Sequence, residues 1–327
     1  MRIAVSGSIA TDHLMVFPGR FADQLVADRL EHVSLSFLAD SLDIRRGGVA
    51  ANVSFGLGQL GLAPVLVGAV GSDFGEYEVR LKEHGVDTES VHVSPAHHTA
   101  RFVCTTDADH NQIATFYAGA MAEARTIGLA PIAARTGGLD LVLVSPNDPA
   151  AMLRHTEECR ALGIPFASDP SQQLARLDRD EVRALIDRAE VLFTNEYESA
   201  LLKERSGWTE QQVLGRTEMW VTTLGEAGSR IRRAGRPTLE VPSVPTTAAV
   251  DPTGVGDAFR AGFLAAVAWG LGVERAAQLG SAIATVVLEC VGTQEYRLDR
   301  ENLTVRLGEA YGPAAVADFA PHLARAL

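Results

Sequence analysis

The stretch Asp251-Pro252-Thr253-Gly254-Val255-Gly256-Asp257-Ala258-Phe259 places two glycines and a carboxylate where an extended segment meets an apolar helical pattern. A helix start presents unpaired backbone N–H groups, and glycines allow a ligand to approach them closely. The turn therefore predicts an anion site formed by Gly254, Val255 and Gly256.

Asp257 is the unusual member of this turn, because a carboxylate repels a bound phosphate. It suits a general base that takes a proton from a hydroxyl attacking phosphorus, while the N–H groups stabilise charge on the transferred group. The alternative is an Asp that caps the first turn of the helix, where this residue is common. The spacing alone leaves both interpretations open.

The composition sets limits on the class of protein. The 327 residues include 29 basic and 41 acidic side chains, for a net charge of −12, and 46% are hydrophobic. These values are typical of a globular α/β protein, and the lack of a basic block argues against a nucleic-acid partner. Three well-separated cysteines predict neither a disulfide framework nor a zinc site. Since no apolar run suits a membrane span or a signal peptide, we expect a soluble cytoplasmic protein.

Strands alternate regularly with helices from residue 139 onward, which predicts a mainly parallel sheet covered by helices on both faces. The predicted strands are 2–7, 65–68, 139–144, 165–168, 191–194 and 220–223, with an edge hairpin over 229–241. The predicted helices start near Val49 and Asn195 or span 73–84, 149–162, 179–188, 255–269 and 273–290, and two more lie in the tail.

Polar residues gather after the predicted strands. Ligands of such sheets bind beyond the carboxyl ends of the strands. The residues expected at that rim are Ser8, Asp12, Asp169, Asn195, Thr223 and Asp257. This convergence favours a general base over a helix cap for Asp257.

Two segments without a helical pattern, about 11–46 and 97–118, predict a small accessory sheet inserted into the N-terminal half of a single domain, 1–327. Alternation at 33–37 suggests a strand there. A hairpin over 99–117 sets Phe102 opposite Phe116. These two rings either close over a flat ligand or pack on each other or on a partner subunit, and the sequence leaves both open.

Residues 56–61, Gly-Leu-Gly-Gln-Leu-Gly, match the pattern GxGxxG. A dinucleotide site needs this pattern after a strand, whereas here it ends a helix. We interpret these glycines as packing and C-capping residues. The chain also lacks a Walker A sequence, so a nucleotide would need another phosphate-binding loop.

Together these motifs resemble those of the ribokinase, or PfkB, family of carbohydrate and nucleoside kinases. Residues 47–52, with Gly61 and Gly71, resemble the N-terminal signature of the family, and residues 251–257 resemble the C-terminal one, with Val255 where Ala or Ser is usual. Asn195-x-x-Glu198 is similar to its NxxE element, and 223–228 to its nucleotide loop. The resemblance implies a three-layer αβα domain with a β-sheet lid.

Within the family, residues 7–13, 34–37, 102, 116 and 169–176 are similar to those of bacterial adenosine kinases. The resemblance implies transfer of the ATP γ-phosphoryl group to the 5′-hydroxyl of adenosine, a step of purine salvage. One alternative is a sugar kinase acting on ribose or a related furanose. Another is a catalytically silent nucleoside sensor.

The resemblance also implies residue roles around Asp257 as the base. The nucleoside site would comprise Ser8, Asp12, Ser36, Gly48, Asn52, Phe102, Phe116, Gln172 and Gln173. The ATP site would comprise Asn195, Thr223, Gly225, Gly228 and Gly256. Glu198 would position Mg²⁺ through water, and a monovalent cation such as K⁺ would lie near Asp251. A homodimer would form through the lid strands. We interpret Arg176 as a solvated charge in preference to a phosphate contact.

Overall fold

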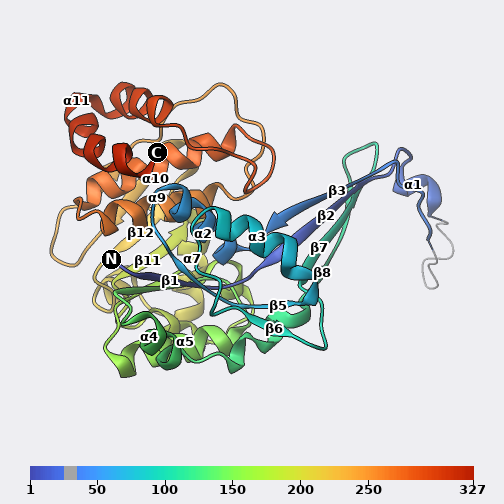
Figure 1. Ribbon diagram of the computed structural model, residues 1–327, viewed down its shortest axis with the longest axis horizontal. Helices are drawn as coiled ribbons and strands as arrows, with labels where there is room; N and C mark the ends of the chain where they lie inside the picture. Colours follow the sequence, from blue (N-terminus) through green and yellow to red (C-terminus); the bar gives the residue numbers. More distant parts are fainter. Residues whose placement is uncertain (26–34) are drawn as a thin grey trace.

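An eight-stranded sheet forms the middle layer of the computed structural model, which describes residues 1–25 and 35–327 (Figure 1). The strands, in spatial order, are β14 (Leu239–Val241), β13 (Ser229–Arg232), β12 (Trp220–Thr223), β11 (Val191–Asn195), β10 (Phe166–Ser168), β9 (Leu141–Val144), β1 (Ile3–Ser6) and β4 (Val65–Val67). Those from β12 to β4 pair in parallel, and β13 and β14 form an antiparallel hairpin at the edge. The predicted sheet and its edge hairpin are confirmed.

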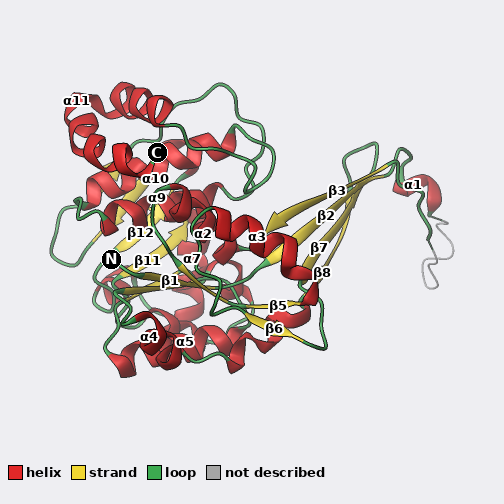
Figure 2. Ribbon diagram, viewed as in Figure 1, coloured by secondary structure: helices red, strands yellow, loops and turns green. Residues whose placement is uncertain are grey.

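Alternate residues of the central strands face two separate helical layers, because side chains alternate across a strand. In β1, Ile3 and Val5 join one apolar cluster and Ala4 joins the other. The first cluster includes α2 (Val49–Gln59), α3 (Gly75–Glu83), α9 (Val255–Ala268), α10 (Val273–Leu288) and α11 (Arg300–Ala326). The second includes α4 (Leu129–Thr136), α5 (Pro149–Leu162), α6 (Arg179–Ile186), α7 (Glu196–Ser206) and α8 (Glu210–Leu214). Figure 2 shows these helices on both faces of the sheet, as expected for three αβα layers.

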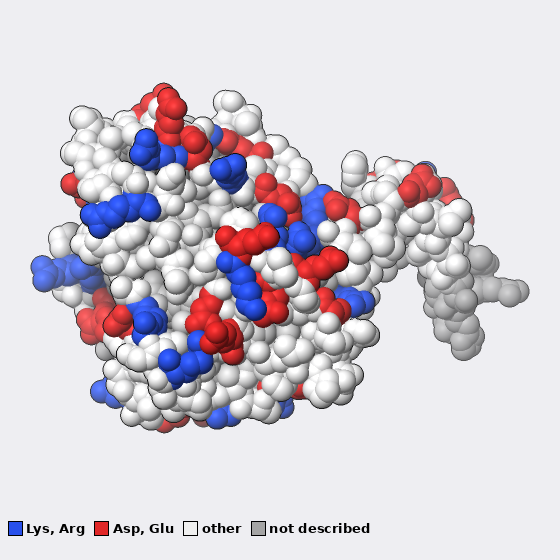
Figure 3. All heavy atoms as spheres, in the orientation of Figure 1, with Lys and Arg blue, Asp and Glu red and all other residues white. Residues whose placement is uncertain are grey.

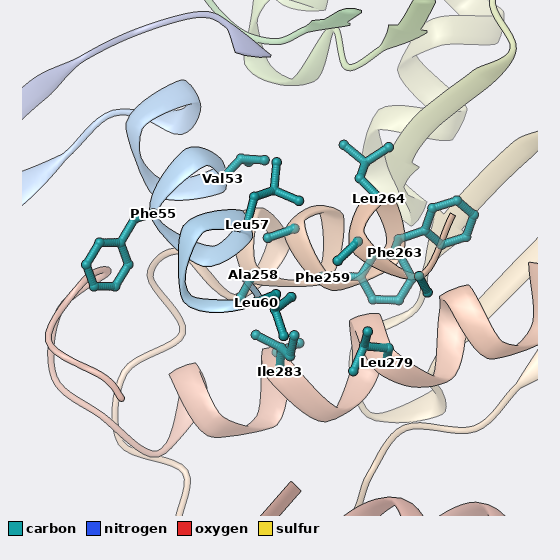
Figure 4. Close-up of a cluster of buried hydrophobic side chains, with 14 of the residues drawn as sticks. Val53, Phe55, Leu57, Leu60, Ala258, Phe259, Phe263, Leu264, Leu279 and Ile283 are labelled. Atoms are coloured by element: carbon teal, nitrogen blue, oxygen red, sulfur yellow. The ribbon is translucent and has the colours of Figure 1, made fainter. Parts of the chain in front are cut away.

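Helices α2, α9 and α10 pack tightly, with Leu57, Phe259 and Ile283 among the side chains that meet between them (Figure 4). A Cβ on Gly56 would lie 2.7 Å from Cβ of Ala261, and one on Gly58 would lie 1.9 Å from the His84 carbonyl oxygen. The interpretation of the GxGxxG pattern as packing glycines is therefore confirmed.

A four-stranded sheet extends from one side of the body (Figure 1), and we call it the lid sheet. Its order is β3 (Ser41–Gly47), β2 (Ala10–Val16), β7 (Ala100–Thr106) and β8 (Gln112–Tyr117). β2 and β7 are parallel, and both outer pairs are antiparallel. Phe102 pairs with Phe116 across β7 and β8, which confirms the predicted hairpin register.

The strand expected at 33–37 is wrong over its described part. Residues 35–39 form no strand, and 33 and 34 lie outside the described residues. Instead, the Phe37 ring packs 5.0 Å from that of Phe17 and 4.9 Å from that of Phe21, near α1 (Phe21–Gln24). Phe37 therefore belongs to a cluster of aromatic rings and not to a strand.

Several short elements have no counterpart among the predictions. They are α4, α8, the paired strands β5 (Ala69–Gly71) and β6 (His92–Ser94), and the 3₁₀ helices η3 (Gly119–Thr126), η4 (Ser171–Ala175) and η5 (Gly225–Ala227). The 3₁₀ helix η2 (Ser72–Phe74) overlaps the start of the helix predicted over 73–84. In the tail, α11 breaks at Gly312, where φ is 82°, and so provides the two helices expected there.

Acidic and basic side chains are interspersed over the face shown in Figure 3. Within residues 1–25 and 35–327, none of the helices has the length and apolarity needed to cross a membrane.

Candidate active site

Helix α9 starts at a turn that only glycine fits well. Gly254 is its N-cap residue with φ 78°, and a Cβ there would lie 2.8 Å from the Thr293 side chain. No side chain caps the helix. The backbone N–H groups of this first turn therefore remain suited to an anion, as the sequence predicts.

Asp257 points across to helix α2 instead of capping its own helix. Its Oδ2 accepts a hydrogen bond of 2.8 Å from Nδ2 of Asn52, which lies in the first turns of α2. Burial raises the pKa of the Asp257 carboxyl, Arg260 and Asn52 lower it, and Glu198 raises it further. The capping alternative is thus wrong, and Asp257 has the aim and the raised pKa of a candidate general base.

Arg260 and Asp169 form a buried ion pair directly below this turn. Arg260 Nη2 donates to Asp169 Oδ1 at 2.6 Å, and Arg260 Nε lies 2.6 Å from Asp169 Oδ2. The side chains are 9% and 1% exposed. Asp169 follows β10, as expected, but Arg260 was not among the predicted site residues. The pair ties the start of α9 to the carboxyl end of β10.

Asp12 lies where the lid sheet meets the body. A Cβ on Gly47 would lie 2.9 Å from Asp12 Oδ2, so the carboxylate rests against the Gly47 backbone. Burial raises the pKa of Asp12, and Arg45 lowers it. Gly48, which follows Gly47, has φ 94° and immediately precedes α2, the helix that also carries Asn52. Asp12 and Asp257 therefore flank the same helix start.

Strand register places Asp12, Phe102 and Phe116 in one row across β2, β7 and β8, and hence on one face of the lid sheet. Phe102 is partly buried, and Phe116 is 52% exposed. The two rings thus share the face that carries Asp12, and Phe116 offers open ring surface.

Asn195 and Glu198 are partners of each other. Asn195 Oδ1 accepts from the Glu198 N–H at 2.7 Å, and Glu198 Oε2 accepts from the Asn195 N–H at 2.8 Å. These two bonds form a capping box at the start of α7. The second Glu198 oxygen accepts from Ser171 Oγ at 3.1 Å. The capping box holds both residues at the rim, at the carboxyl end of β11.

The segment after β12 forms a glycine-dependent loop. Gly228 has φ 93°, and a Cβ there would lie 2.1 Å from the Val241 carbonyl oxygen. The Leu224 N–H donates to the Gly228 carbonyl at 2.8 Å and closes the loop around Gly225. Thr223 ends β12 and lies beside Asn195 in the sheet register.

Other predicted residues lie in different settings. Ser8 Oγ accepts from the Val49 N–H at 3.0 Å and so caps α2. Gln173 is buried, with Nε2 donating to the Asn147 carbonyl at 2.9 Å, whereas Gln172 and Arg176 are exposed. Ser36 lies beside the Phe17–Phe21–Phe37 cluster, past the ends of β2 and β3 that are remote from Gly47. The structure therefore does not bring Ser36 together with Asp12 and Asn52.

The described residues contain no group of three or more His, Cys, Asp or Glu side chains that could hold a metal ion. Mg²⁺ often binds through one or two carboxylates together with the phosphates of a substrate. Glu198, whose Oε1 accepts a hydrogen bond from Ser171 Oγ, suits that kind of shared site better than a site formed by protein ligands alone. The residues present fit a metal that arrives with a nucleotide.

Comparison with known proteins adds to this geometry. The sequence model described as pfkB family carbohydrate kinase matches residues 10–300. The nucleoside kinase of Methanothermobacter thermautotrophicus is 34% identical over 257 residues, which cover 76% of this chain and 80% of that protein. The adenosine kinase of Schizosaccharomyces pombe is 28% identical over 172 residues, which cover 48% of this chain and 50% of that protein.

Among solved structures, the ligand-free nucleoside kinase of Burkholderia thailandensis has a TM-score of 0.84 at 33% identity, covering 93% of this chain and 99% of that one. The same protein in complex with inosine has a TM-score of 0.82 at 33% identity, covering 95% and 98% of the two chains. Both matches therefore cover more than nine tenths of this chain.

Proposed function

Because the chain belongs to the pfkB family of carbohydrate kinases and, within it, to the nucleoside kinases, we propose that it transfers the γ-phosphoryl group of ATP to the 5′-hydroxyl of adenosine, giving AMP and ADP. The observation that carries this proposal is the hydrogen bond from Asn52 to Asp257. It holds the Asp257 carboxylate beside the start of α2, where Asp12 also lies. The adenosine kinase of S. pombe supports the choice of nucleoside.

In the proposed reaction, Asp257 removes the proton of the 5′-hydroxyl as its oxygen attacks the γ-phosphorus. The bond between that phosphorus and the bridging oxygen breaks, and ADP leaves. The N–H groups of Gly254, Val255 and Gly256 stabilise the charge on the transferred group. Asp12 binds the 2′- and 3′-hydroxyls, because its two oxygens suit a vicinal diol.

The nucleotide and its cations are assigned to the rim beside this turn. ATP would be held by Asn195, Thr223, Gly225 and Gly228, and Glu198 would position its Mg²⁺ through water. When bound, Mg²⁺ neutralises charge on the β- and γ-phosphates. A monovalent cation such as K⁺ is assigned to the surroundings of Asp251, whose carboxylate accepts N–H groups from Thr253 and Gly292 at 2.9 and 3.0 Å.

The adenine ring is assigned to Phe102 and Phe116, supported by their shared row with Asp12. Replacing Phe102 with Ala should raise the KM for adenosine by a factor that corresponds to about 1–3 kcal/mol, the contribution of one stacking partner. The kcat should change less. Steady-state kinetics with adenosine as the varied substrate measure both. Thr115→Ala, on the opposite face of β8, is the control. An unchanged KM for Phe102→Ala would mean that Phe102 and Phe116 only pack within the lid sheet and do not bind adenine.

The other face of the lid sheet carries exposed apolar side chains, which support the proposal of a homodimer. Leu42, Ile44 and Ile113 are 56%, 57% and 46% exposed, and register places them opposite to the Asp12 row. Ile44→Asp should therefore convert a dimer to a monomer, because a charge in an apolar interface loses its hydration. Light scattering measures the mass. Val79→Asp, at an equally exposed valine on α3, should leave the mass unchanged.

Turnover of adenosine, inosine, guanosine and ribose with ATP tests the proposal. Inosine is included because the B. thailandensis relative was solved with it. We expect adenosine to give the highest kcat/KM and AMP as the product. Ribose as clearly the best substrate would favour the sugar kinase, and binding of adenosine without turnover would favour the silent sensor.

A further inference from the structure

The Asn52 side chain is held from both ends of its carboxamide. Its Nδ2 donates to Asp257 Oδ2 at 2.8 Å, while its Oδ1 accepts from Thr293 Oγ1 at 2.9 Å and from Gln294 Nε2 at 2.8 Å. An ionised carboxylate can only accept hydrogen bonds, so the amide nitrogen must face Asp257 and the oxygen must face the other two residues. Thr293 and Gln294 therefore complete the orientation of Asn52.

Gln294 uses both of its N–H bonds in this network. Nε2 lies 2.8 Å from Asn52 Oδ1 and 2.5 Å from the Tyr77 hydroxyl oxygen, and Tyr77 in turn donates to the Gly47 carbonyl at 2.9 Å. Gln294 is 0% exposed, and Asn52, Tyr77 and Thr293 are also buried. Because water does not reach these groups, a donor that is removed cannot be replaced easily.

Thr293 connects Asn52 to the lid sheet as well. Its Oγ1 lies 2.9 Å from Asn52 Oδ1 and 2.9 Å from the Arg46 carbonyl oxygen, near the end of β3. A hydroxyl carries one proton and so serves only one of these acceptors at a time. The Thr293 methyl group lies against Gly254, at the start of α9. Thr293 therefore contacts the end of β3, Asn52 and the turn at Gly254.

We propose that Thr293 and Gln294 are positioning residues for phosphoryl transfer, because they fix the Asn52 carboxamide with its nitrogen against Asp257. The inference rests on the function proposed above for Asp257. Neither residue is assigned a contact with the nucleoside, and both act through Asn52. When the carboxamide is free to rotate, Asp257 loses its donor and its fixed position, and small misplacements of a reacting group are costly in rate.

Replacement of the hydroxyl gives the first test. Thr293→Val keeps the shape of the side chain and removes the donor, so kcat should fall about fivefold to tenfold, the effect of one net hydrogen bond, with the KM for adenosine unchanged. Thr293→Ser restores the hydroxyl and should recover most of kcat. Equal losses in Val and Ser variants would overturn the inference.

A double-mutant cycle separates positioning from packing. In an Asn52→Ala background, Thr293→Val should change kcat by less than about twofold, since its partner is already absent. Unfolding by urea of the same four proteins should show the same coupling, and this readout does not depend on the reaction. Full activity of Asp257→Asn would overturn the proposed base and, with it, the role of Thr293 in phosphoryl transfer. Low activity of Asp257→Asn together with additive effects on unfolding would leave the proposed function in place. Additive effects of the two replacements on unfolding would overturn the inference about Thr293.

Discussion

Replacing Asp257 with Asn should lower kcat for adenosine phosphorylation by about a hundredfold or more, which is the usual size of a general-base effect. The amide keeps the shape of the carboxylate, and its oxygen still accepts from Asn52 Nδ2, so the local structure should persist. What is lost is the ability to take the 5′-hydroxyl proton. Adenosine binding should be spared, because Asp12 and the ring pair lie on other elements.

Two measurements check this prediction together. Steady-state kinetics give kcat, and calorimetry gives the Kd for adenosine. Asp180→Asn, whose native side chain is 93% exposed on α6, is a matched control and should leave both unchanged. An Asp257→Asn variant with wild-type kcat would remove the base from the mechanism, and equal losses in binding and turnover would make Asp257 a binding residue only.

Arg260→Met should destabilise the protein by about 3–5 kcal/mol, the usual cost of leaving one partner of a buried ion pair alone. Met preserves much of the side-chain volume, so the loss reports on the unpaired Asp169 carboxylate. Urea unfolding measures the change in free energy. The control is Arg230→Met, which breaks the exposed pair with Glu240 and should cost at most about 1 kcal/mol. Similar losses in the two variants would contradict the importance of the buried pair.

The same variant should show a distinct pH dependence. Burial raises the pKa of Asp169 to about 7, although Arg260 lowers it, so the pKa should rise further without Arg260. A carboxyl whose pKa is higher in the folded state binds more protons there, and stability falls as the pH rises through that interval. The difference in unfolding free energy between wild type and Arg260→Met should therefore grow above about pH 7.

Local sequence signals were sufficient for much of the fold. Apolar strand runs and helical periods located the parallel sheet, and the glycine pattern at 254–256 located the start of α9. The polar residues after β10, β11 and β12 were expected at one rim because parallel strands end at one edge. At 33–37, however, alternation was misleading, since Phe37 belongs to a ring cluster.

The partners of these residues were beyond local signals. Asn52 meets Asp257 from 205 residues away, and Thr293 reaches Asn52 from 241 residues away, so no spacing predicts either contact. Two features did carry a usable signal. Arg260 is the one charged residue in the stretch 258–268, and a buried cation needs an acidic partner. Asn195-x-x-Glu198 has the form of a capping box, which the structure contains.

A crystal structure with adenosine bound tests the central claim most directly. The account predicts that the 5′-oxygen lies within about 3.2 Å of an Asp257 carboxylate oxygen, with the 2′- and 3′-hydroxyls on Asp12. Adenosine bound with its 5′-hydroxyl directed away from Asp257 would contradict it.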